Sequence, residues 1–227
     1  MKTRLHTACT VAAATLLVSA SASAQDTFQV EQFEPQHAQG INILGVARSQ
    51  TLGHLTPSAG LFFHFQDDPY QVETNGGEVR ARLIDHQLKA ELNGGIGLFG
   101  LADLGVALPL VLLQSGEGST DASVSSFSGF ALADLRLTPK FRLLRNERTG
   151  GFGVALLAPM WLPLGDEASY NSDGAFRIEP RAAVDWASDF LTLALNLGVQ
   201  FRPEREVLNY TSGNALRYGL AAELPVA

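Results

Sequence analysis

The segment 191–202, LTLALNLGVQFR, alternates large apolar residues with polar or small ones at every step. Successive side chains of a β-strand point to opposite faces, whereas a helix repeats only every 3.6 residues or so. The segment therefore predicts a strand with one apolar face and one polar face. The apolar face carries Leu191, Leu193, Leu195, Leu197, Val199 and Phe201, and the other carries Thr192, Ala194, Asn196, Gly198, Gln200 and Arg202.

The same period of two recurs along the chain, which predicts an all-β protein. The clearest further strands are 84–98, 130–144, 176–187 and 216–226. Segments 104–113 and 152–164 are apolar on both faces apart from small residues, and we also expect them to be strands. Weaker patterns add 41–48, 58–66 and a short strand at 28–33, which gives ten predicted strands.

The connections between these strands alternate between short and long. The short ones are 99–103, 145–151 and 188–190, and the long ones are 115–128, 166–175 and 203–214. Barrels of the bacterial outer membrane have short periplasmic turns and longer outside loops. We therefore predict an antiparallel up-and-down transmembrane β-barrel of about ten strands, with both chain ends on the periplasmic side.

Composition agrees with that fold class. Hydrophobic residues make up 46% of the 227 residues and charged residues only 17%, yet no apolar run approaches the roughly 18 residues of a membrane helix. A spanning chain without such helices must close as a barrel, because lipid satisfies no backbone hydrogen bonds. Prolines inside predicted strands require bulges or bends there, since each removes a ladder hydrogen bond. These are Pro109, Pro139, Pro159, Pro180 and Pro225.

The N-terminus has the features of a secretory signal peptide. Lys2 and Arg4 precede an apolar run at 8–18, and Ala22-Ser23-Ala24 provides a small-residue cleavage site. We predict a signal peptide at 1–24 and a barrel domain at 25–227. Cys9 lies within the signal segment, so the mature chain has no cysteine for a disulfide.

Charge excludes one class of partner. The formal net charge is −7, so we expect no nucleic-acid partner. The apolar content is also too high for an intrinsically disordered chain.

The polar faces of the strands place charges of both signs in the barrel interior. An unpaired charge there costs several kcal/mol, so these groups must pair. The first interpretation is a salt-bridge network that fills a narrow barrel, and the second is a charged lining that selects small hydrophilic solutes. The predicted lumen-facing residues are Asp134, Arg136, Lys140, Arg142, Arg177, Glu179, Arg181, Asp185, Arg202, Arg217 and Glu223.

Other motifs do not lead to a catalytic, cofactor or metal prediction. The segment 95–100 matches G-x-G-x-x-G but precedes no helical pattern, so we interpret it as a glycine-rich turn. His86 with Ser123, Ser125 or Ser126 is the one conceivable nucleophile pair, and we predict no enzyme activity. The acidic loop 166–173 and Asp67-Asp68 are interpreted as solvated charges, with cation binding as the alternative.

Several segments resemble a known family. They are 104–116 (LGVALPLVLLQSG), 133–144 (ADLRLTPKFRLL), 151–166 (GFGVALLAPMWLPLGD), 195–203 (LNLGVQFRP) and 218–226 (YGLAAELPV). Together they look like the N-terminal barrel of OmpA-family proteins of delta-proteobacteria, especially myxobacteria. The resemblance lies in strand texture and covers most of the chain after residue 24.

The resemblance implies a location in the outer membrane and a structural, anchoring role in the envelope. The implied partners are outer-membrane lipids, lipopolysaccharide and the barrel insertion machinery. Peptidoglycan would be reached through a further domain, and we expect the barrel to be incomplete at Ala227.

Two other functions fit the pattern. The first is a small porin or channel for hydrophilic or apolar molecules. The second is a soluble periplasmic β-sandwich carrier, which would need a second sheet to cover the apolar faces of 191–201 and 216–226.

Overall fold

The computed structural model describes residues 29, 33–73, 79–117, 127–145, 151–207 and 210–224. The predicted signal peptide, Pro225 and most of 28–33 lie outside these residues. One 12-stranded antiparallel sheet contains a path of eight principal strands. In path order these are β1 (Pro57–Glu73), β2 (Val79–Leu98), β3 (Ala102–Gly116), β6 (Leu135–Leu144), β7 (Phe152–Leu157), β10 (Arg181–Ala187), β11 (Thr192–Gln200) and β14 (Ala215–Glu223).

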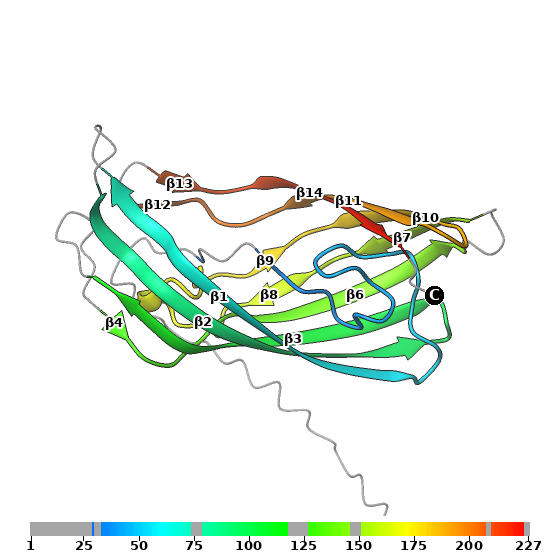
Figure 1. Cartoon of the computed structure of the whole chain (residues 1–227), viewed down its shortest axis with the longest axis horizontal. Coiled ribbons are helices and arrows are strands. Elements are labelled where there is room, and N and C mark those ends of the chain that lie inside the picture. Colours follow the sequence, from blue (N-terminus) through cyan, green and yellow to red (C-terminus); the bar gives the residue numbers. More distant parts are fainter. Residues whose placement is uncertain are drawn as a thin grey trace, which may run out of the picture.

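Shorter elements lie beside this path, and one hairpin among them forms a separate two-stranded sheet. They are β4 (Phe127–Ser128), β5 (Ala131–Leu132), β8 (Met160–Leu162), β9 (Arg177–Ile178), the hairpin β12 (Arg205–Val207) and β13 (Tyr210–Ser212), and the 3-10 turn η2 (Glu167–Ser169). The sheet curls into an open barrel (Figure 1). The predicted all-β, antiparallel barrel architecture is thereby confirmed. Across the described ranges, no helix is long and apolar enough to cross a membrane.

The strand predictions at the N-terminus need correction. Residues 41–48 form no strand, only an isolated bridge between Ile43 and Val46. Gln29 and Phe33, the described residues of 28–33, are also outside strands. The first strand instead begins at Pro57 and continues past the predicted end at residue 66 to Glu73. The sequence pattern ends this strand at residue 66 because the acidic pair Asp67-Asp68 follows there and interrupts the apolar row.

Of the four described prolines within predicted strands, two interrupt the strands, whereas Pro109 and Pro139 lie inside β3 and β6. Pro159 separates β7 from β8, and Pro180 separates β9 from β10. The carbonyl of each of these four prolines still accepts a backbone hydrogen bond from a neighbouring part of the wall. The donors to Pro109, Pro139, Pro159 and Pro180 are the N–H groups of Ala133, Ala158, Glu179 and Val199.

The wall is apolar outside and polar inside. A register row on the outer face joins Phe141, Leu156, Ala182, Leu197 and Tyr218 on five neighbouring strands. The four large side chains of this row are between 49% and 81% exposed. The adjacent inner row contains Asp103, Lys140 and Arg181, all of which are buried. Within the described part of the chain, no second sheet covers the apolar faces of β11 and β14, contrary to the β-sandwich alternative.

The barrel is open along one seam. Among the described residues, β1 pairs only with β2 and β14 only with β11, so these two edges share no ladder. Residues 33–53, which we call the inner segment, run through the interior beside this opening, as the blue trace in Figure 1 shows. The inner segment has no counterpart in the predicted up-and-down barrel.

Candidate functional site: a filled barrel interior

The structure buries eight of the eleven predicted lumen residues. These are Asp134, Arg136, Lys140, Arg177, Glu179, Arg181, Asp185 and Arg202. The side chains of Arg217 and Glu223 are 23% and 52% exposed, because β14 borders the open seam. Arg142 is half-buried and donates to the carbonyl of Gly100 in the turn between β2 and β3.

At the end of the barrel that carries β12 and β13, four charges form one network. Arg177 lies 3.2 Å from Asp134 and 3.3 Å from Asp173, and Arg202 lies 2.5 Å from Asp173. The Arg177 guanidinium also stacks 4.9 Å above the ring of Trp161. Charge-assisted hydrogen bonds offset the cost of removing these ions from water.

A second network lies at mid-barrel and includes the inner segment. Arg136 pairs with Glu91 at 2.9 Å and with Glu34 at 3.8 Å. It also donates to the carbonyl of Pro35 at 2.5 Å. Glu34 and Pro35 belong to the inner segment, so one wall arginine binds that segment through both a carboxylate and the backbone.

Nearer the short-turn end, the wall satisfies the backbone of the inner segment. The N–H of Ser49 donates to Asp185 at 2.6 Å, and the N–H of Ala47 donates to Asn196 at 2.8 Å. The Asn196 amide in turn donates to the carbonyl of Ala47 at 2.7 Å. A side-chain amide thus replaces a strand neighbour and satisfies both polar groups of one residue.

Asp103 binds the inner segment at two points. One carboxylate oxygen lies 2.8 Å from Nε2 of His37, and the other accepts from the N–H of Leu52 at 3.2 Å. Lys140, on the neighbouring strand, donates to Asn42 at 3.3 Å. The inner segment is therefore held by side chains from β3, β6, β10 and β11.

Glycines on the wall make room for this segment. A methyl group at Gly105 would lie 2.2 Å from Nδ1 of His37, and one at Gly97 would lie 2.0 Å from the carbonyl oxygen of Gly53. Gly97 belongs to the G-x-G-x-x-G match at 95–100, whose last glycine, Gly100, forms the turn with φ of 61°. The motif is therefore a turn together with a packing surface, consistent with the prediction of a glycine-rich turn.

The predicted acidic loop folds into the barrel. Asp166 accepts from the N–H of Ala168 at the start of η2, while Asp173 is buried between Arg177 and Arg202. Burial raises the pKa of Tyr170, whose ring packs edge-on against Tyr70 of β1. Among the described residues there is no group of three or more potential metal ligands. The loop thus closes one end of the interior, a role that its charge pattern did not predict.

The conceivable pair of His86 with a nearby serine is only partly described, because Ser123, Ser125 and Ser126 lie outside the described residues. His86 instead approaches Ser115, whose hydroxyl lies 3.2 Å from Nε2 and 3.4 Å from Nδ1. A general base needs the hydroxyl directed at one nitrogen. The nearly equal distances do not show such a direction, so we assign no catalytic role to this pair.

Sequence reasoning omitted several residues from the site. Asp103 was missed because the predicted strand began at residue 104. Glu91 lies in the predicted strand 84–98 and Asn196 on the polar face of 191–202, but neither was assigned to the site, because polar residues facing a lumen do not reveal their partners. The contribution of the inner segment, including Glu34 and His37, had no signal beyond a short apolar pattern that suggested strands.

Little free space remains around Arg136 and Glu91. The cavity between the inner segment and the wall strands β2, β6 and β8 has a volume of only about 10 Å³. That is about the minimum for one water molecule. The arrangement can hold the inner segment in place, but at this point it leaves no room for a solute.

The geometry defines a β-barrel protein whose outer face is apolar and whose inner face is polar. The inner segment and the buried side chains occupy the interior. The sequence model of one family, described as "Putative MetA-pathway of phenol degradation", matches residues 67–227. This match covers more than two thirds of the chain, so the protein belongs to that family. It includes the wall from the second half of β1 onward. A search of curated proteins found no match. The OmpA resemblance stays a prediction.

Proposed function

We propose that this protein is an outer-membrane β-barrel with a structural role in the envelope, and that its resting form is closed to ions. The observation that carries the proposal is the polarity of the wall. Outward-facing leucines of β11 are 40–52% exposed, while the inner face buries paired charges. Apolar rows this extensive favour contact with hydrocarbon, and polar groups inside a barrel are compatible with lipid outside. A location in the bilayer also requires the edges of β1 and β14 to find hydrogen-bond partners there, because lipid offers none.

The signal-peptide pattern at 1–24 supports export. The expected partners are outer-membrane lipids, lipopolysaccharide and the insertion machinery. An anchoring role of the OmpA type through peptidoglycan belongs to the same proposal, and would require a domain other than the barrel.

The contacts of the inner segment support a closed resting state. Backbone N–H groups of this segment donate hydrogen bonds to Asp103, Asp185 and Asn196. Without the segment, these side chains would line a polar lumen. Removing the two carboxylates breaks the contacts with Ser49, Leu52 and His37 but leaves the outward-facing residues unchanged.

Planar-bilayer recordings test this account. We expect the full chain to be silent and the double variant Asp103→Ala/Asp185→Ala to show ion-conducting openings. Glu223→Ala is the matched control, because Glu223 forms only a long, exposed pair with Arg48 at 3.5 Å. Regular conductance steps from the unmodified chain would contradict a closed resting state and favour the porin alternative.

A second candidate function is passage of small apolar molecules. The family description names phenol degradation, and a pocket of about 380 Å³ lies at the open seam. The test is uptake of a radiolabelled alkylphenol into outer-membrane vesicles with and without the protein. Equal uptake rates would reject this function without affecting the structural one.

A further inference from the structure

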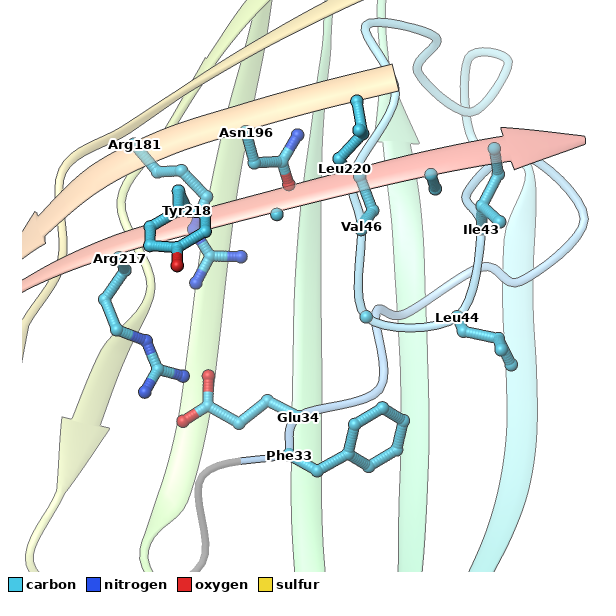
Figure 2. Close-up of a pocket in the computed structure, with 13 residues that line it drawn as sticks. Phe33, Glu34, Ile43, Leu44, Val46, Arg181, Asn196, Arg217, Tyr218 and Leu220 are labelled. Carbon is cyan, nitrogen blue, oxygen red and sulfur yellow. The ribbon is translucent and has the colours of Figure 1, made fainter. Parts of the chain in front are cut away.

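The pocket at the seam lies between β14 and the inner segment. Its volume is about 380 Å³, and its walls come from 33–34, 43–46, Arg181, Asn196 and 217–221 (Figure 2). It therefore joins the polar interior to the edge of the wall, at the place where β1 and β14 share no ladder.

The two ends of the pocket differ in chemistry. Apolar side chains from the inner segment, including Phe33, Ile43 and Leu44, lie at one end, whereas Glu34 and Arg217 lie toward the other. Figure 2 shows the charged groups of Glu34 and Arg217 turned toward the same space. A ligand that fits this arrangement has an apolar body and one polar group.

The apolar end is formed by a turn that the structure holds in place. The N–H of Ile43 donates to Val46 and the N–H of Val46 donates to Ile43, at 3.0 and 2.8 Å. Leu44 at the tip has φ of 49°, which a leucine rarely adopts, and remains 57% exposed. Such strain persists only where the surroundings enforce it, and it is often found at binding sites.

Small residues on β14 create the space opposite this turn. Gly219 and Ala221 face inward, and a methyl group at Gly219 would already lie 3.2 Å from Val46. Larger inward-facing side chains would fill the pocket. The neighbouring outward residues Tyr218 and Leu220 are 81% and 76% exposed, so the pocket borders the apolar outer surface.

From this geometry we infer that the seam pocket binds a neutral, largely apolar molecule that carries one hydroxyl group, such as an alkylphenol. The inference rests on the second candidate function and specifies its ligand. A hydroxyl both donates and accepts, so it can bond to the Glu34 carboxylate and to the Arg217 guanidinium together.

An anionic ligand fits less well. Glu34 would repel a carboxylate, and Arg181 and Arg217 both already lie beside the Glu179 carboxylate, at 2.6 and 3.9 Å. The pocket should therefore prefer a phenol to the benzoate of similar size. It should also prefer the phenol to its methyl ether, which cannot donate a hydrogen bond.

The test is calorimetric titration of the full chain, folded in detergent, with 4-propylphenol, 4-propylanisole and 4-propylbenzoate. We expect one binding site for 4-propylphenol. The affinities for 4-propylanisole and 4-propylbenzoate should be weaker by a factor of about ten or more. Ala221→Phe should abolish binding by filling the pocket, and Arg217→Met should weaken phenol binding about tenfold. Arg48→Met is the matched control, since Arg48 lies outside the pocket and should leave binding unchanged.

Circular dichroism and the heat-dependent gel shift of each variant establish that it folds. Equal binding of the ether, tighter binding of the benzoate, or unchanged phenol binding by folded Ala221→Phe would overturn the inference. Failure of vesicle uptake with intact phenol binding would instead reject transport alone. The two proposals can thus fail separately.

Discussion

The two faces of β11 illustrate how differently the two sides of this wall are specified. Outward, Leu193, Leu195 and Leu197 are alike and could be exchanged for other apolar residues with little change. Inward, Asn196 binds both polar groups of Ala47, which lies 149 residues earlier in the chain. The outer face requires only apolar character, whereas the inner face requires particular partners. The effect of a substitution should therefore depend on the polarity of the new side chain on the outer face and on the lost partners on the inner face.

The largest effect is expected for Arg177→Met on the inner face. The variant removes the one cation that lies within 3.3 Å of both Asp134 and Asp173 among the described residues. Asp173 keeps Arg202 at 2.5 Å. Loss of one partner of a buried ion pair costs about 3–5 kcal/mol, so the free energy of unfolding should fall by that amount. Urea titration of the lipid-embedded protein measures it. Arg48→Met, which removes an exposed pair, should cost about 0–1 kcal/mol. Equal losses would remove the distinction between specific and non-specific positions.

On the outer face, Leu195→Arg should be the next most costly change. Leu195 is 49% exposed and lies on a row of apolar residues. An arginine facing the middle of a bilayer costs about 2–4 kcal/mol, whereas on a water-exposed surface the change would stay within about 0.5 kcal/mol. The same urea titration distinguishes these values. A small loss at Leu195, Leu197 and Leu220 alike would show that water, not lipid, contacts this face.

A smaller effect is expected where the wall approaches the inner segment. Gly105→Ala would place a methyl group 2.2 Å from the His37 ring, so His37 must move away from Asp103. Overpacking of this kind costs about 1–3 kcal/mol. Gly40→Ala is the control, because no heavy atom lies within 4 Å of its added methyl group. Thermal unfolding of the two variants provides the comparison, and indistinguishable midpoints would argue against a tightly packed inner segment.

These differences also explain what the sequence could predict. The period of two placed the principal strands from residue 84 onward, because the apolar rows are regular along each strand. The same reasoning failed at 41–48, where the apolar residues belong to a turn closed by the Ile43–Val46 bridge and not to a strand of the wall. A local pattern cannot distinguish a strand of the wall from a segment enclosed by that wall.

The interior was predictable as a set of charges but not as a set of partners. Arg177 and Asp134 were expected on inner faces, but their link to Asp173 depends on the infolding of the 163–176 loop. Likewise, Asp103 and His37 are 66 residues apart, and only the threading of the inner segment brings them together. Partners of this kind depend on the tertiary path, which no periodicity records.

The central claim is that the outward leucines contact hydrocarbon. Its most direct measurement is electron paramagnetic resonance of spin labels at Leu195→Cys, Leu197→Cys and Leu220→Cys, in a Cys9→Ser chain reconstituted into vesicles. The account predicts that each label collides readily with oxygen, which concentrates in the bilayer, and rarely with a water-soluble nickel chelate. Labels equally accessible to the nickel chelate on all three strands would contradict it.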